Sequence, residues 1–122
     1  MNMNEIATAV RQKLPLIEVI VNNHVLGMVR QWQDLFYEKR YSATVLDDGV
    51  DYVKLAEAMG ETGYRATTRE AFNEALKAAL AAKTPVVIDC VIGCDDKVWP
   101  MVAPGADIST AFTGEDLVAV QS

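Results

Sequence analysis

The chain has 122 residues, of which 51% are hydrophobic and 23% are charged, and its formal net charge is −6. These values are ordinary for one soluble globular domain, and the scattered basic residues argue against nucleic acid or an anionic membrane as a partner. No apolar run approaches the roughly 20 residues of a membrane span, and the polar start Met1–Glu5 lacks the basic region of a signal peptide. We therefore expect a cytoplasmic protein without a membrane segment.

The first part of the chain predicts a helix, a strand and a second helix. Apolar residues recur at helical spacing from Asn4 to Lys13, and Pro15 ends this pattern. The run Leu14–Val21 is almost continuously apolar and β-branched, which is typical of a parallel strand that is buried on both faces. We expect this strand at Leu16–Val21. An amphipathic helix should follow from about Leu26 to Tyr37.

The middle of the chain predicts a loop and a short helix. Lys39–Val50 has no clear period and contains the turn signal Asp47–Gly49. Asp51 suits the N-cap of a helix over Tyr52–Met59, and Gly60 is a typical C-terminal stop.

A strand, a helix and a second apolar strand come next. Thr62–Ala66 predicts a weak strand, after which Thr67 and Glu70 have the spacing of a capping box. Val86–Ile92 predicts another parallel strand of the buried kind. The helix between the strands should run to Lys83 with five apolar side chains facing inward: Phe72, Ala75, Leu76, Ala79 and Leu80.

This order of elements implies right-handed crossovers and a three-layer α/β sandwich around a mainly parallel sheet. We assign residues 1–93 to this domain and residues 94–122 to a C-terminal tail that is either disordered or a lid. Cys90 falls in the last strand. Its spacing from Cys94, without a histidine cluster, indicates two reduced thiols rather than a disulfide framework or a zinc site.

A polar turn follows the first buried strand, at the place where α/β proteins bind their ligands. Asn22 and Asn23 offer uncharged amide oxygens, and a backbone carbonyl one or two residues later can add another, which suits Mg²⁺ shared with substrate phosphates. Gly27 lets a phosphate approach the first N–H groups of the next helix. The two asparagines also fit a simple Asx turn without a ligand, and the residues alone leave both interpretations open.

Three further side chains near the turn invite a functional interpretation. Met28 and Trp32 lie on one helix face, where such residues belong to a core more often than to a cofactor site. His24 is the only histidine and has no paired carboxylate in the sequence, so we assign it no catalytic role. The sequence has no nucleophile elbow, P-loop or metalloprotease pattern.

Segments spread over nearly the whole chain carry a resemblance to one family: Met1–Asn2, Glu5–Ala9, Leu14–Asn23, Leu26–Gln33, Leu35–Tyr37, Arg40–Ser42 and Val98–Gly105. Together they resemble the C-terminal thiamine-diphosphate-binding domain of the acetolactate synthase catalytic subunit, also called acetohydroxyacid synthase. The run Gly27–Gln33 is specific to this branch. The asparagine pair alone would indicate only some thiamine-diphosphate enzyme.

The resemblance implies a thiamine-diphosphate-binding fold and roles for seven residues of the turn and the helix. Asn23, through its side chain, and Val25, through its carbonyl oxygen, would bind the Mg²⁺ that bridges the cofactor diphosphate. The other residues would line the cofactor or the substrate channel: Leu26, Gly27 and Met28 for the cofactor, and Val29 and Trp32 for the channel. In the family, the tryptophan shapes the preference for the second substrate.

The resemblance also implies a reaction, in which pyruvate is decarboxylated and joined to a second 2-ketoacid in branched-chain amino-acid biosynthesis. The family enzyme also holds FAD, forms a homodimer or homotetramer and can have a regulatory subunit. The chain starts just after the position of the family's Gly-Asp-Gly turn, whose aspartate is a Mg²⁺ ligand. We therefore expect a fragment that lacks the first strand or strands, is inactive by itself and binds the cofactor weakly or not at all.

Two other functions remain as alternatives. The first is another thiamine-diphosphate carboligase or decarboxylase, such as a glyoxylate carboligase, against which the run Arg30–Trp32 argues. The second is a non-catalytic α/β module that acts through protein interaction.

Overall fold

The structure is a computed structural model that describes residues 3–46 and 49–120. None of the helices in these ranges is both long and apolar enough to cross a membrane. The elements are α1 (Glu5–Gln12), β1 (Ile17–Asn22), α2 (Gly27–Phe36), α3 (Tyr52–Met59), β2 (Thr62–Ala66), α4 (Arg69–Ala81), β3 (Val86–Val91), the 3-10 helix η1 (Ile108–Thr110) and α5 (Gly114–Val120). From α1 to β3 they follow the order expected from the sequence, whereas η1 and α5 lie in the tail, where no helix was expected.

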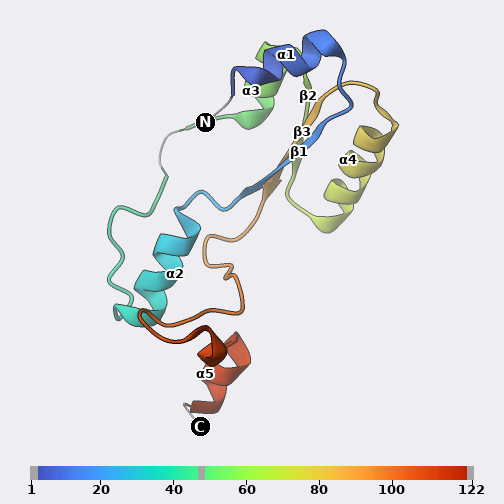
Figure 1. Cartoon of the computed structure of the whole chain (residues 1–122). Helices are drawn as coiled ribbons and strands as arrows, with labels where there is room; N and C mark the ends of the chain where they lie inside the picture. The colour runs from blue at the N-terminus through green and yellow to red at the C-terminus, as the bar shows by residue number, and fades with distance from the viewer. Residues whose placement is uncertain (1–2, 47–48, 121–122) are drawn as a thin grey trace.

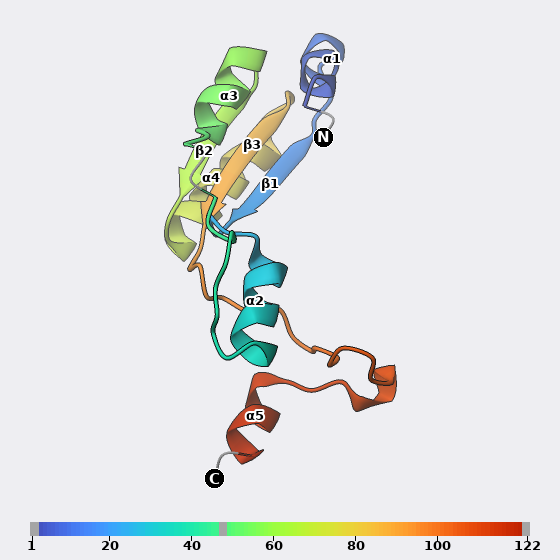
Figure 2. The same cartoon turned by 90° about the vertical axis from the view of Figure 1, so that its left-hand side faces the viewer.

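The sheet is parallel, with the strand order β1-β3-β2. The helix α4 covers one face of the sheet over β2 and β3, whereas α3 packs on the other face and α1 packs against α3 (Figures 1 and 2). This arrangement confirms the expected three-layer α/β sandwich. Because parallel strands need crossover connections, each pair of neighbouring strands is joined through at least one helix.

Small side chains let the layers approach closely. Between α4 and the sheet, the core consists of buried alanines packed against the apolar residues of β3: Ala66, Ala75, Ala79, Val86 and Ile88. On the other face, α3 lies so close to β2 that a Cβ atom added to Gly63 would sit 3.0 Å from the backbone of Val53. Glycine at this position therefore sets the distance between α3 and the sheet.

Several local signals act as predicted. Asp51 caps α3, with its side chain accepting a hydrogen bond from the backbone N–H of Lys54, and Gly60 ends the helix with a left-handed φ of 93°. Cys90 lies in β3, and both cysteines are free thiols. Of the turn expected at Asp47–Gly49, Asp47 and Asp48 lie outside the described residues.

The expectation that β1 is buried on both faces is wrong. Val19 and Val21 are 42% and 65% exposed, and the helix α4 does not extend over this strand. In contrast, β3 is fully buried from Val86 to Asp89 because it is the central strand. The apolar runs of the two strands look alike in the sequence, so only the strand order separates them.

Two details of the α4 prediction are also wrong. The helix is capped by Thr68, whose hydroxyl accepts from the N–H of Ala71, so Thr67 and Glu70 do not form the expected capping box. Leu80 is 70% exposed rather than facing inward, because the alanines at the end of α4 already fill the space against the sheet. The helix ends at Ala81, two residues before Lys83.

The helix α2 does not cover the sheet. It continues from the carboxyl end of β1 and lies beyond the strands, together with the tail and α5 (Figures 1 and 2). In its described part the tail is ordered against α2: Met101 and Phe112 pair through two backbone hydrogen bonds, and the ring of Phe112 contacts Phe36 edge to face at 6.2 Å. The turn between β1 and α2 is therefore at the carboxyl edge of the sheet.

Candidate functional site

Two successive Asx turns connect β1 to α2. The side-chain oxygen Oδ1 of Asn22 accepts the backbone N–H of His24 at 3.1 Å, and Oδ1 of Asn23 accepts the backbone N–H of Val25 at 3.2 Å. His24 is exposed and has a φ of 56°, a left-handed conformation that residues other than glycine adopt mainly in turns. The chain thus turns from the strand to the helix within a few residues.

The turn brings the two expected metal ligands together. The Asn23 side chain contacts the backbone of Val25, and the carbonyl oxygen of Val25 accepts no hydrogen bond from any group in the described part of the chain. The turn is also held by the loop between α2 and α3, which we call the 40s loop. Leu26 N donates to Thr44 O at 2.8 Å, and Leu46 N donates to His24 O at 2.9 Å. An unpaired carbonyl beside an amide oxygen is a donor set that fits Mg²⁺.

Gly27 lies close to the side chain of Asn23. A Cβ atom added to Gly27 would lie 2.6 Å from Nδ2 of Asn23, so a side chain here would displace the Asn23 amide. The first turn of α2 also contains no acidic residue. A helix N-terminus that is free of negative charge and approached closely by backbone suits an anionic diphosphate.

Polar side chains from all three strands meet behind the turn. The buried carboxylate of Asp89 on β3 accepts from Nδ2 of Asn22 at 3.0 Å and from Nε of Arg65 on β2 at 3.1 Å. Arg65 also donates to Asp51, the N-cap of α3, at 2.7 Å. These residues border a cleft of about 630 Å³ that His24 also lines. Asp89 and Arg65 were not among the site residues expected from the sequence, because nothing in their local pattern marks them as neighbours of the turn.

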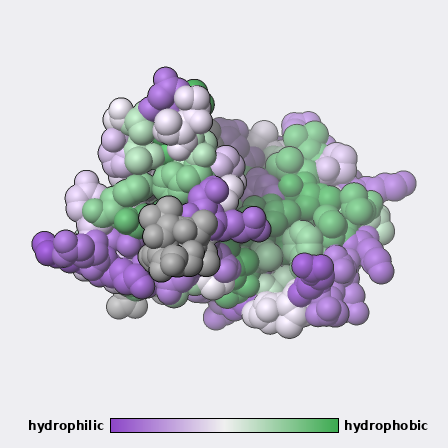
Figure 3. Space-filling model, turned by 90° about the horizontal axis from the view of Figure 1, so that it is seen from below, coloured by the Kyte–Doolittle hydropathy of each residue, from purple (hydrophilic) through white to green (hydrophobic). Residues whose placement is uncertain are grey.

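The outer face of α2 is apolar and exposed. Met28 and Val29 are 65% and 49% exposed, and with Trp32 and Tyr37 they line a recess of about 370 Å³. Leu26 is 44% exposed just before the helix. Viewed from the end at which α2 and α5 lie, the molecule has broad green apolar areas between purple hydrophilic ones (Figure 3). The general expectation that Met28 is a core residue is therefore wrong.

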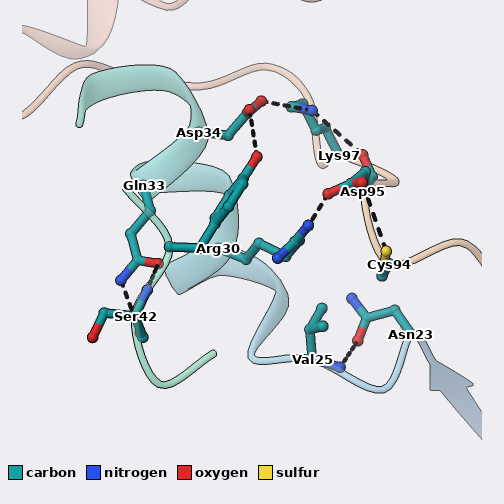
Figure 4. Close-up of polar contacts among 10 residues, drawn as sticks. Asn23, Val25, Arg30, Gln33, Asp34, Ser42, Cys94, Asp95 and Lys97 are labelled. Atoms are coloured by element: carbon teal, nitrogen blue, oxygen red, sulfur yellow. Dashed lines mark hydrogen bonds and ion pairs between the residues drawn. The ribbon is translucent and has the colours of Figure 1, made fainter. Parts of the chain in front are cut away.

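The opposite face of α2 binds the tail (Figure 4). Arg30 donates to Asp95 at 2.7 Å, and its guanidinium lies 4.0 Å from the ring centroid of Tyr41. Asp34 accepts from the Tyr41 hydroxyl and pairs with Lys97, both at 2.8 Å. The Lys97 ammonium holds the pKa of the Asp34 carboxyl below its ordinary value, and the Asp34 carboxylate raises the pKa of Tyr41.

Gln31 is the buried residue of α2. Its side chain forms two reciprocal hydrogen bonds with the backbone of Val98, each 2.9 Å long. The structure buries this amide because the tail packs here as extended backbone. Extended backbone offers an N–H and a C=O side by side, which a glutamine side chain can match.

The turn provides only part of a metal site. Among residues 3–46 and 49–120, no group of three or more histidine, cysteine, aspartate or glutamate side chains could hold a metal ion. Asn23 and Val25 together offer two oxygen atoms. A near-octahedral Mg²⁺ would need its remaining ligands from phosphate, water or residues outside the described part of the chain.

The fold and the site define a class of protein: an α/β domain with a parallel sheet and a polar, diphosphate-compatible turn at the carboxyl end of a strand. Residues 1–90 match the family model described as thiamine pyrophosphate enzyme, C-terminal TPP binding domain. The chain belongs to this family.

Curated relatives match most of the chain. It is 44% identical over 106 residues to an acetolactate synthase large subunit of Parasynechococcus marenigrum and 46% identical over 110 residues to an acetolactate synthase of Mycobacterium avium, in each case over 86% of this chain. It is 42% identical over 109 residues to the acetolactate synthase isozyme 2 large subunit of Escherichia coli, over 89% of this chain. The chain spans only 17% to 20% of the length of these relatives.

Two solved structures are similar in fold. One is a thiamine diphosphate-dependent 4-hydroxybenzoylformate decarboxylase of Rhodococcus jostii, with a TM-score of 0.67 and 30% identity over 75% of this chain and 17% of that one. The other is a benzoylformate decarboxylase of Polynucleobacter necessarius, with a TM-score of 0.69 and 27% identity over 80% of this chain and 18% of that one. The thiamine-diphosphate-binding fold that the sequence predicts is thus confirmed.

Proposed function

We propose that this chain is the diphosphate-binding part of an acetolactate synthase, which condenses pyruvate with a second 2-ketoacid in branched-chain amino-acid biosynthesis. The observation that carries this proposal is the identity of 42% to 46% with acetolactate synthases over at least 86% of the chain. This stretch includes the turn in which Oδ1 of Asn23 and the unpaired carbonyl oxygen of Val25 lie beside Gly27, a combination that fits a metal and a diphosphate. When bound, thiamine diphosphate supplies the electron sink for decarboxylation and carbon–carbon bond formation.

In this proposal the turn holds Mg²⁺ through the side-chain oxygen of Asn23 and the carbonyl oxygen of Val25. Leu26, Gly27 and Met28 line the cofactor. The absence of a side chain at Gly27 keeps space for the Asn23 amide, which supports this assignment.

Val29 and Trp32 line the substrate channel in this proposal. Their position in an exposed apolar recess of α2 supports it, because a channel for small ketoacids needs an apolar wall that is accessible from outside.

The proposal extends to the parts of the enzyme that work with this chain. Residues 1–93 belong to the cofactor-binding domain, and residues 94–122 form a segment that closes over it as a lid. The complete enzyme is cytoplasmic, carries FAD in another domain, assembles as a homodimer or homotetramer and can bind a regulatory subunit. Because Asn23 and Val25 supply only two oxygens, we predict that the isolated chain forms no acetolactate and binds Mg²⁺–thiamine diphosphate weakly or not at all.

A decarboxylase of the same cofactor class is the second candidate. The two solved structures favour it, because both are benzoylformate-type decarboxylases with TM-scores near 0.7. Their identity to this chain, 27% to 30%, is lower than that of the acetolactate synthases. A non-catalytic interaction module is less well supported, because the metal-compatible turn would then have no role.

A chimera tests the proposed function. The matching segment of the Escherichia coli isozyme 2 large subunit is replaced by this chain, and product formation is measured with pyruvate and with benzoylformate. We expect acetolactate from pyruvate. In the chimera, Asn23→Ala should raise the Mg²⁺ concentration for half-maximal activity at least about tenfold, whereas Asn73→Ala, at an exposed position of α4, should not.

Other outcomes of the chimera experiment would contradict the proposal. A folded chimera that binds the cofactor and releases benzaldehyde from benzoylformate, but forms no acetolactate, would favour the decarboxylase. A folded chimera in which Asn23→Ala changes nothing would remove the metal assignment.

A further inference from the structure

A network of hydrogen-bonded polar side chains lies at the carboxyl ends of the three strands. The proposed reaction assigns no role to this network. Asp89 is its centre: the residue is 1% exposed, and each of its carboxylate oxygens accepts one hydrogen bond. Oδ1 accepts from Nδ2 of Asn22 on β1, and Oδ2 accepts from Nε of Arg65 on β2. The side chain therefore joins the two outer strands across the central one.

The charge of Asp89 fixes the orientation of the Asn22 amide. A carboxylate can only accept hydrogen bonds, so the amide must turn its NH₂ group toward Asp89. Its oxygen then faces the opposite way, where it accepts the N–H of His24. The first Asx turn, between Asn22 and His24, therefore depends on a side chain at position 89 that only accepts hydrogen bonds.

Arg65 fixes the position of the Asp89 carboxylate. Arg65 lies directly beside Asp89 in the register of β2 and β3, and its second donor group binds Asp51, which caps α3 through the N–H of Lys54. The carboxylate is thus clamped between an amide and a guanidinium that is itself anchored to a helix end. Hydrogen bonds at both ends of the Asn22, Asp89 and Arg65 contacts restrict the rotation of these side chains.

The position of Asp89 would otherwise favour an apolar side chain. It lies on the central strand, where the preceding residues Val86, Val87 and Ile88 are all buried and apolar. Packed apolar residues stabilise such sites at least as well as buried ion pairs. The stability of the fold therefore does not explain a carboxylate at this position. Its orientation of the Asn22 amide does.

We propose that Asp89, held by Arg65, is a positioning residue that orients the turn at Asn22 so that Asn23 and Val25 present their oxygens to the metal of the bound diphosphate. This role rests on the proposed function. Neither Asp89 nor Arg65 contacts the metal or the cofactor in this scheme. They act through Asn22 and the turn.

The order of the turn can be measured in the chain itself, without metal or cofactor. In Asp89→Asn, the new amide can offer its oxygen to Arg65 or to Asn22 but not to both, so the Asn22 amide flips and loses the His24 bond. By NMR we expect hydrogen exchange of the His24 and Val25 amides to rise about tenfold relative to the amides of β3 and α4. A general loss of stability would instead raise hydrogen exchange in the turn, β3 and α4 together.

A reciprocal exchange provides the rescue. In the double variant N22D/D89N the introduced amide donates to the introduced carboxylate, keeps its oxygen for Arg65, and leaves a carboxylate oxygen for His24 N–H. The net charge is unchanged, and exchange at His24 and Val25 should return to the wild-type rate. Arg65→Gln, at a half-exposed residue, is the milder variant if Asp89→Asn fails to fold, and it should also raise exchange at His24.

Glu61→Gln is the matched control. Glu61 is also buried and acidic, but it precedes β2 at the amino end of the strands. This variant should leave the His24 and Val25 amides unchanged. In the chimera described above, Mn²⁺ affinity measured with thiamine diphosphate should fall about 10- to 100-fold in D89N, recover in N22D/D89N and stay constant in E61Q.

The outcomes separate this role from the proposed function. Unchanged exchange at His24 and Val25 in D89N, or a double variant that is no better than the single one, would overturn the positioning role even in an active chimera. If the chimera forms no acetolactate while the exchange results hold, the proposed function fails and the control of the turn by Asp89 stands.

Discussion

Burial decides the state of Glu61. The side chain is 6% exposed, and neither of its carboxylate oxygens has a hydrogen-bond partner among the described residues. Burial raises the pKa of Glu61, and the nearby negative charge of Glu18 raises it further. An unpaired buried carboxylate is costly, so folding shifts Glu61 toward its protonated form relative to the unfolded chain.

This raised pKa makes stability depend on pH. A group whose pKa is higher in the folded state contributes stability below its unfolded pKa, about 4.3 for glutamate, and this contribution is lost as the pH rises through the folded pKa. We expect Glu61→Gln to increase the free energy of unfolding by about 1 kcal/mol near pH 8 and to have little effect near pH 4. Urea unfolding at both pH values measures this.

Glu57→Gln serves as its control, because it makes the same substitution at an exposed position of α3. An equal effect of Glu61→Gln at both pH values would mean that Glu61 is not the titrating group.

The helix α2 connects the turn to the tail. Its first residues follow the Asn22–Val25 turn, its outer face lines the apolar recess, and its inner face holds residues 95–98 of the tail. Arg30, Gln31 and Asp34 each bind a different tail residue. One element therefore carries both the proposed cofactor contacts and the attachment of the proposed lid.

The contact between Gln31 and Val98 should determine how firmly the tail is held. Gln31→Ala removes two hydrogen bonds and leaves the N–H and C=O of Val98 without partners, at a cost of about 1–3 kcal/mol. We expect hydrogen exchange of the Val98 amide to rise at least about tenfold, and limited proteolysis near residues 94–98 to become faster.

Gln33→Ala is the comparison for this experiment, since Gln33 binds Ser42 in the 40s loop and not the tail. Equal exchange at Val98 in both variants would show that the ion pairs of Arg30 and Asp34 hold the tail without the buried amide.

For the whole molecule, the exposed side of β1 is the main consequence of the strand order. Within the described residues β1 pairs only with β3, so its other edge presents unpaired N–H and C=O groups. Val19 and Val21 add exposed apolar surface on the same strand, beside Leu16. Such an edge favours association with another copy or another segment.

We therefore expect the chain to form oligomers in solution. Val21→Lys places a charge on the edge strand and should shift light scattering toward the monomer mass of 13.4 kDa, whereas Ile108→Lys, at an exposed apolar residue of η1, should not. A wild-type chain that is monomeric over a wide range of concentration would contradict this prediction.

The sequence predicted the elements from α1 to β3, but not η1 and α5 in the tail. It also predicted that the turn after β1 resembles a metal site. These features could be predicted because they are local. Helical spacing found α1, α3 and α4, and Asp51 and Gly60 marked the ends of α3. The assignment of Asn23 and Val25 as metal ligands came from the family resemblance, and it stays a prediction.

The tertiary structure alone decided which strand is central, which charges meet and which side chains are covered. The runs at β1 and β3 are equally apolar, yet one lies at the edge because burial depends on the neighbours that a strand acquires. Asp89, Arg65 and Asn22 are far apart in the chain and meet only through the register of three parallel strands. Hydrophobic periodicity has no information about such long-range pairings, because it reports the face of an element and not its partner.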